Sequence, residues 1–204
     1  MFEYLGLPGV GKTWILFNGS LTKNKSVITH SIPLGGGKNK LINTLAGIIF
    51  NPKLFIYLLR LSLKHKNEMP DNFIFRPYLV IFERYGRVLR LCFGSKNEIH
   101  VDEGSYQFIW RVFSELELNE KNIDDFKKVI KIFNHSKSKI IYIGSSKHIN
   151  LKRIIERGKV ESNFDLNVIN NKLVNYTLGR SWMSLLILEL RKLNILNYYN
   201  NEQA

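Results

Sequence analysis

One short segment near the amino terminus constrains the fold more than any other, namely "GLPGVGKT" from Gly6 to Thr13. It matches the pattern G-x-x-x-x-G-K-[ST] at every fixed position. The preceding run Phe2–Leu5 is strand-like, and the apolar run Trp14–Phe17 favours the start of a helix. A strand, a glycine loop and a helix, in this order, are the context that the pattern requires. The alternative interpretation is a glycine-rich turn with an exposed lysine.

Such a loop binds phosphate through its backbone. Glycines at positions 6, 9 and 11 let successive N–H groups point inward at phosphate oxygens, with the positive end of the next helix behind them. In this arrangement the Lys12 ammonium reaches the β and γ phosphates, and the Thr13 hydroxyl binds magnesium. We therefore expect ATP and Mg²⁺ as cofactors. The predicted nucleotide contacts are Gly6, Pro8, Gly9, Val10, Gly11, Lys12, Thr13 and Trp14.

Apolar periodicity predicts strands that alternate with helices. Strands are predicted at 2–5, 26–32, 97–104, 139–146 and 193–199. A loop is predicted at 33–40, and helices at 40–49, 53–66, 71–92, 106–118, 122–133 behind Asn122, 149–157 and onward from 163. This alternation predicts an α/β fold with a parallel sheet covered by helices on both faces. The sequence shows no repeat and no low-complexity linker, so we predict a single domain over residues 1–204.

The chain is strongly basic, with a formal net charge of +13. This charge predicts an anionic partner and leaves open a nucleotide, a phosphorylated substrate, nucleic acid or a lipid surface in peripheral contact. Because no basic run with interleaved aromatic residues is typical of a known nucleic-acid module, we do not expect nucleic-acid binding. The abundance of lysine, asparagine and isoleucine is also explained by a coding bias toward A and T.

Several features bear on the cellular setting. Because the first predicted strand begins almost at Met1, we expect no signal peptide, and the single Cys92 forms no internal disulfide. These features predict a cytoplasmic protein. The longest apolar runs, Leu41–Phe50 and Leu54–Leu63, are each shorter than the roughly 20 residues of a membrane-spanning helix. The apolar helices between residues 40 and 92 are equally suited to covering the sheet or a partner subunit, which leaves a homodimer open.

Two acidic residues lie at the end of the third predicted strand. Asp102 is the candidate for holding magnesium through water, because strand ends in open α/β sheets face the ligand crevice. Glu103 is the candidate for orienting or deprotonating the attacking group. The alternative interpretation is a solvated turn.

The segment "NLKRIIERGK", residues 150–159, supplies positive charge. A predicted buried stripe of Leu151, Ile154 and Ile155 leaves Arg153 and Arg157 side by side on the other face of a helix. Two guanidinium groups on a helix end can clamp the oxygens of a phosphoryl group in transfer. The alternative interpretation is a solvated basic face.

Together, "GLPGVGKT", "VDEG", "IIYIGSS" and "LKRIIERG" resemble the nucleoside and nucleoside-monophosphate kinases, including thymidylate kinases. The resemblance implies a three-layer P-loop NTPase fold, with a lid at about 153–163 that carries Arg153 and Arg157 as catalytic residues beside Lys12 and Glu103. It also implies an acceptor site on the middle helices, with His30, Arg76 and Gln107 as candidate contacts. Their alternative interpretations are a loop histidine, a surface arginine and an exposed helix glutamine.

The sequence therefore predicts an ATP-dependent small-molecule kinase. Its acceptor is left open among a nucleoside, a nucleotide, a sugar and a glycan-pathway intermediate. One alternative is a regulatory or partner-coupled NTPase, although "NKLV" at 171–174 lacks the aspartate of the guanine-reading pattern Asn-Lys-x-Asp. Another is a P-loop sulfotransferase, which Lys12, Thr13 and Asp102 disfavour because they suit magnesium and ATP.

Overall fold

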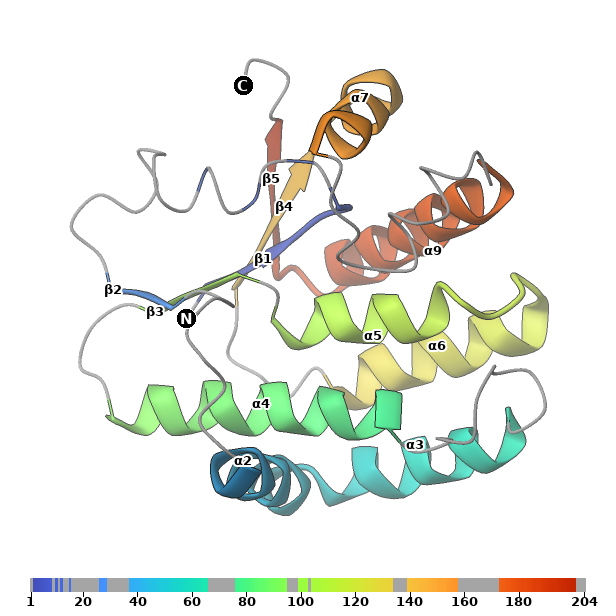
Figure 1. Ribbon diagram of the computed structural model, residues 1–204. Helices are drawn as coiled ribbons and strands as arrows, with labels where there is room; N and C mark the ends of the chain where they lie inside the picture. The colour runs from blue at the N-terminus through green and yellow to red at the C-terminus, as the bar shows by residue number, and fades with distance from the viewer. Residues whose placement is uncertain are drawn as a thin grey trace.

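A parallel five-stranded sheet forms the centre of the protein, which we describe from a computed structural model (Figure 1). Its strands are β1 (Phe2–Leu5), β2 (Ser26–Ile28), β3 (Ile99–Asp102), β4 (Lys139–Gly144) and β5 (Leu196–Asn200). The structure describes residues 2–8, 10, 12, 15, 26–28, 37–65, 76–94, 99–102, 104–133, 139–157 and 173–200.

The strands lie in the order β2-β3-β1-β4-β5, and every pairing is parallel. The central strand β1 pairs with β3 on one side and with β4 on the other, so Tyr4 lies opposite both Asp102 and Ile141. The connection that follows β1 runs toward the β2 edge of the sheet, whereas the connections that follow β3 and β4 run toward the β5 edge. The direction of the connections thus reverses between the neighbouring strands β1 and β3. Ligands of open α/β sheets bind beyond the strand ends at such a reversal.

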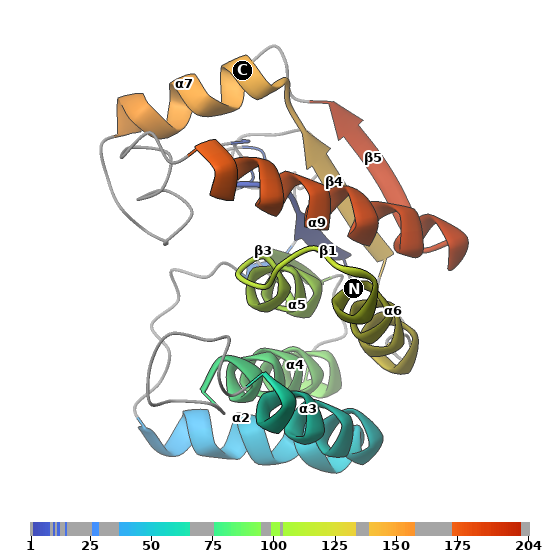
Figure 2. The same cartoon turned by 90° about the vertical axis from the view of Figure 1, so that its right-hand side faces the viewer.

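Three helices cover one face of this sheet. They are α4 (Arg76–Gly94), α5 (Ser105–Phe113) and α9 (Leu173–Lys192), which contact β3, β1 and β5 respectively (Figures 1 and 2). The predicted α/β class, with a parallel sheet packed against helices, is confirmed. Of the helix predicted to start at Trp14–Phe17, the structure describes only Ile15, which is helical, as is Lys12 before it.

An outer group of helices packs on this first layer. It comprises α2 (Gly37–Phe50), α3 (Pro52–Lys64) and α6 (Glu120–Phe133), while α7 (Lys147–Arg157) lies beyond the carboxyl end of β4 (Figure 1). The backbones of α2 and α4 touch, because a Cβ at Gly47 would overlap the Phe82 carbonyl and one at Gly86 would overlap the Asn43 carbonyl. Glycine at both positions therefore sets the distance between these helices.

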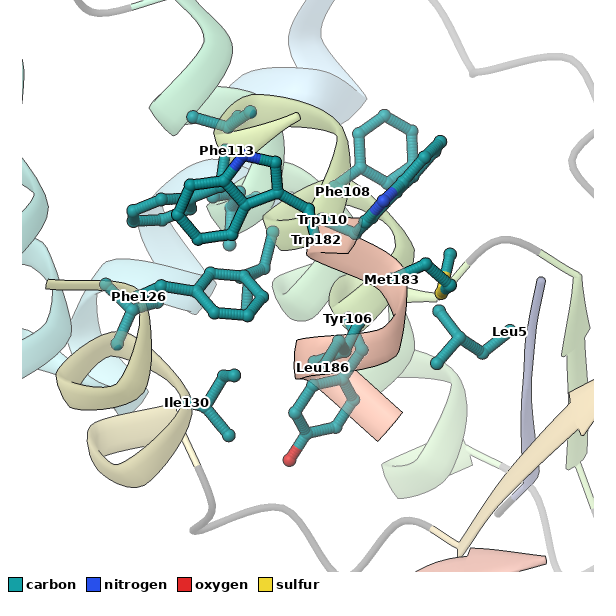
Figure 3. Packing of buried hydrophobic residues seen from close by; sticks show 14 of the residues in the cluster. Leu5, Tyr106, Phe108, Trp110, Phe113, Phe126, Ile130, Trp182, Met183 and Leu186 are labelled. Carbon is teal, nitrogen blue, oxygen red and sulfur yellow. The ribbon is translucent and has the colours of Figure 1, made fainter. Parts of the chain in front are cut away.

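The hydrophobic core lies around α5, in which every residue except Arg111 is buried. Aromatic side chains from α5, α6 and α9 meet there edge to face, including Phe113, Phe126 and Trp182 (Figure 3). The two buried indoles each donate a hydrogen bond to a backbone carbonyl, Trp110 to Gly179 at 2.8 Å and Trp182 to Leu116 at 3.0 Å. These bonds satisfy the polar atoms that burial takes from water.

The structure corrects three details of the predicted elements. Residues 37–40 are helical and begin α2, although a loop was predicted to extend to residue 40. The predicted helix 106–118 ends at Phe113. The cap of α6 is Asn119, whose side-chain oxygen accepts from the Asn122 N–H at 2.9 Å, so Asn122 is a buried residue of the first turn. Asparagine is a favoured cap residue, and it occurs at both 119 and 122, so the local pattern did not decide which of the two caps the helix.

Among the described residues, no single helix has the length and apolar character needed to cross a membrane. Of these helices, only residues 39–50 and α3 taken together have the required length and apolar character, and the chain bends by 106° between them.

Candidate functional site

The glycine loop begins where β1 leaves the sheet, and its first residue, Gly6, is buried. A Cβ at Gly6 would lie 2.6 Å from the carbonyl oxygen of Ile143 and 2.8 Å from a methyl carbon of Val10. Only glycine lets the loop leave β1 this close to the backbone of β4. This glycine is therefore required for packing between strands as well as for the curl of the loop.

Lys12 folds back over the start of the loop. Its side chain is 8% exposed, and its ammonium donates to the carbonyl oxygens of Gly6 at 2.9 Å and Leu7 at 3.4 Å. A buried ammonium must be hydrogen-bonded, and backbone carbonyls are neutral acceptors. Phosphate oxygens are charged acceptors and bind such a group more strongly. The geometry is compatible with phosphate binding by Lys12, which stays a prediction.

Gln107 connects α5 to the loop. Its side-chain oxygen accepts the backbone N–H of Gly6 at 3.1 Å, and the residue is 2% exposed. The alternative of an exposed helix glutamine is therefore wrong. The described contact joins Gln107 to the loop, while its predicted contact with an acceptor stays a prediction. Residues separated by 101 positions in sequence fix the first amide of the loop.

Arg153 reaches the loop from α7. One of its terminal nitrogens donates to the carbonyl oxygen of Val10 at 3.4 Å, and its side chain is half-buried. The predicted buried stripe on α7 is partly wrong, because Ile154 is buried but Ile155 is 60% exposed. Arg157 ends α7 one turn further on, and its side chain lies outside the described residues.

The two predicted carboxylates are only partly described. The backbone of Asp102 ends β3 opposite Tyr4, two residues before the loop. The side chain of Asp102 and the whole of Glu103 lie outside the described residues, so their predicted roles stay predictions. Within the described part of the chain, no group of three His, Cys, Asp or Glu side chains is placed to hold a metal ion.

A third acidic residue, Glu3, was missed by the sequence reasoning. It is 2% exposed in β1, its carboxylate contacts Gly104, and its Oε2 lies 3.5 Å from the Tyr106 N–H at the start of α5. Burial and the Glu3 charge raise the pKa of Tyr85 on α4. The sequence held one signal for this residue, namely a single acid within the predicted strand "FEYL". Charged residues are almost never buried without partners, so an acid in a buried strand indicates that polar groups lie beside it.

A cationic cluster on α4 and α5 was also missed. The guanidinium carbons of Arg84 and Arg111 lie 4.9 Å and 5.1 Å from the centre of the Phe108 ring, within cation–π range. Phe108 follows Gln107 directly, so both cations lie near the helix that contacts the loop. Arg84 is also buried beside Glu83 at 3.5 Å.

The remaining predicted site residues are outside the described part. They are Gly9, Gly11, Thr13, Trp14 and His30. Pro8 is described as a half-buried turn residue of the loop, and Arg76 begins α4 with a side chain that is not described. The lid predicted at 153–163 is described only up to Arg157.

Comparison of the sequence with protein-family models and with curated proteins finds no match. Among solved structures, the fold is similar to that of deoxyadenosine kinase from M. mycoides with bound dATP. The two chains share 15% identity at a TM-score of 0.47, and the alignment covers 98% of this chain and 90% of the other.

Proposed function

We propose that this protein is an ATP- and magnesium-dependent phosphotransferase of the P-loop class, acting on a small molecule. One observation supports this most, namely that polar side chains from two distant helices reach the glycine loop. Gln107 from α5 binds the loop's first amide, and Arg153 from α7 donates to the Val10 carbonyl. A solvated basic face on α7 would not bring a half-buried arginine to this loop.

We propose that two cations of the site stabilise the negative charge that develops during transfer. Lys12 is already desolvated, so its exchange of backbone carbonyls for phosphate oxygens requires little reorganisation. Arg153 donates to the Val10 carbonyl of the same loop and adds a second cation. In phosphoryl transfer, positioning and electrostatic stabilisation supply nearly all of the catalysis.

A magnesium ion fits the proposed donor set. Asp102 ends a strand beside β1, and Thr13 follows Lys12, so a carboxylate and a hydroxyl would hold the ion. Magnesium held there would neutralise charge on the phosphate oxygens. Glu103, the next residue along, is proposed to accept the proton of the acceptor's attacking group.

The acceptor is proposed to bind along α5, beyond Gln107. Arg84 and Arg111 both lie against the Phe108 ring there, and two guanidinium groups favour an acceptor that carries its own negative charge. A nucleotide or a phosphorylated sugar meets this requirement better than an uncharged nucleoside or sugar. The predicted contacts His30 and Arg76 remain candidates for the same ligand.

ATP turnover with and without an extract of small metabolites tests this proposal. A kinase turns over slowly until its acceptor is present, so the extract should raise ADP formation. Truncating Arg153 to alanine should lower the stimulated turnover about 10²- to 10³-fold, the range for losing one transition-state donor, with little change in the KM for ATP.

The adjacent Lys152 provides a matched control. Its ammonium is exposed and pairs with Glu156 one turn away at 3.7 Å, so Lys152→Ala should retain activity. Equal activity in both variants would remove Arg153 from the mechanism. Turnover that is fast and indifferent to every extract fraction would indicate an ATPase that acts on a protein partner instead.

A further inference from the structure

The outermost helix, α2, exposes a row of apolar side chains and buries the polar Asn43. Its inward face, toward α4, includes Asn43, whose amide lies 3.4 Å from Glu83 Oε1 and accepts from Arg90 at 2.8 Å. Its outward face carries Leu41, Ile42, Leu45 and Ile49, which are 61%, 48%, 49% and 73% exposed. A surface helix of a soluble protein has the opposite arrangement.

These four side chains form one continuous stripe, which we call the α2 stripe. Leu41, Leu45 and Ile49 follow each other at intervals of four residues, and Ile42 lies seven residues before Ile49. Such intervals place all four on one side of a helix. Figures 1 and 2 show α2 at the margin of the molecule farthest from the sheet, with α4 between them.

The neighbouring helix α3 adds apolar and basic side chains. Ile56 and Leu63 are 49% and 59% exposed there, and Lys53 and Arg60 are exposed as well. The inner side of α3 contacts α6, as that of α2 contacts α4, and both of these helices lie toward the sheet (Figure 1). The exposed faces of α2 and α3 therefore both lie away from the sheet.

The charge of this surface has one sign. Residues 37–64 contain five basic residues and no Asp or Glu. Lys64 is paired with Asp125 of α6, while Lys40, Lys53 and Arg60 are exposed. Apolar side chains flanked by cations on helices are typical of segments that lie in the interface of an anionic membrane.

From this arrangement we infer that α2 and α3 form a docking surface for an anionic lipid bilayer. The stripe on α2 enters the boundary between headgroups and acyl chains, and the cations of α3 contact the headgroups. The 106° bend between the two helices suits a pair that lies on the membrane. A second copy of the chain is the less suitable occupant, because pairing these surfaces would bring the exposed Lys40, Lys53 and Arg60 of each copy close to one another.

Co-sedimentation of the whole protein with vesicles tests the inference. We expect binding to vesicles of phosphatidylcholine and phosphatidylserine in equal parts, weak binding to phosphatidylcholine alone, and weakening of the former by added salt. Leu45→Ser should lower the affinity for anionic vesicles roughly ten-fold, since it removes most of one inserted side chain. Lys53→Gln and Arg60→Gln should each lower it roughly five-fold.

Leu188→Ser is the matched control. Leu188 on α9 is 49% exposed, the same fraction as Leu45, but lies on another helix. It should bind vesicles as the unchanged protein does, and circular dichroism should show both variants folded. No binding to anionic vesicles, or equal binding by the Leu45 and Leu188 variants, would overturn the inference. The inference would also be overturned if the protein forms a dimer in the absence of vesicles and Leu45→Ser dissociates that dimer. The surface would then bind a second copy of the chain.

Discussion

Replacing Gln107 with leucine should destabilise the protein and weaken nucleotide binding together. Leucine fills a similar volume but cannot accept the Gly6 N–H, which lies 3.1 Å from the glutamine oxygen. The Gly6 N–H would lose its partner, and because Gly6 is buried, water would not replace that partner. An unpaired buried donor costs about 1–3 kcal/mol of stability. For a protein of this size, a loss of about 2 kcal/mol corresponds to a fall in Tm of roughly 4–8 °C.

The same change should appear in ATP binding. If the loop adopts another conformation in the variant, ATP binding must restore the conformation that binds ATP. Each kcal/mol of free energy needed for this change raises the Kd for ATP roughly five-fold. Thermal melting by circular dichroism and titration calorimetry with ATP measure the two effects. Asn122→Leu is the control, because Asn122 donates to the Glu117 carbonyl at 2.9 Å, far from the loop, and should leave the Kd unchanged. An unchanged Tm and Kd in Gln107→Leu would refute the reasoning.

Three further predictions concern packing and pH. Gly86→Ala should destabilise the protein by about 1–3 kcal/mol in chemical denaturation, because the new methyl group would overlap the Asn43 carbonyl of α2. Gly104→Ala should lower ATP turnover as well as stability, since its methyl group would displace the buried Glu3 carboxylate at the start of α5. Burial alone would raise the pKa of Asp125, but hydrogen bonds from Lys64 and Tyr57 outweigh it and lower that pKa. The unfolded chain thus binds more protons at acid pH, so stability should fall as the pH drops below about 5, and less steeply in Asp125→Asn.

The strands that lead to the candidate site could be predicted from the sequence. The apolar run before the glycine loop predicted β1 with the bounds that the structure has. The third and fourth strands were likewise predicted where β3 and β4 lie, because short apolar runs bounded by polar turns are typical of buried parallel strands.

Contacts between distant segments could not be predicted in this way. A glutamine on a helix has no local feature that marks it as buried, and the partner of Gln107 is 101 residues away. Ile155 shows the reverse error, since periodicity placed it in a buried stripe although it faces solvent. The inverted faces of α2 were missed for the same reason, because the apolar run Leu41–Phe50 is compatible with burial on every side until its neighbours are known.

The central claim, transfer of phosphate to a small molecule, is tested most directly by following the γ-phosphate of ATP. The protein is incubated with ATP labelled with ¹⁸O in that group, magnesium and a fractionated metabolite extract, and the products are identified by mass spectrometry. The account predicts a labelled phosphoryl group on one organic, anionic acceptor, and its loss in Lys12→Ala, since the Lys12 ammonium lies over the loop's first carbonyls. Label found solely in inorganic phosphate, at a rate that no fraction changes, would contradict it.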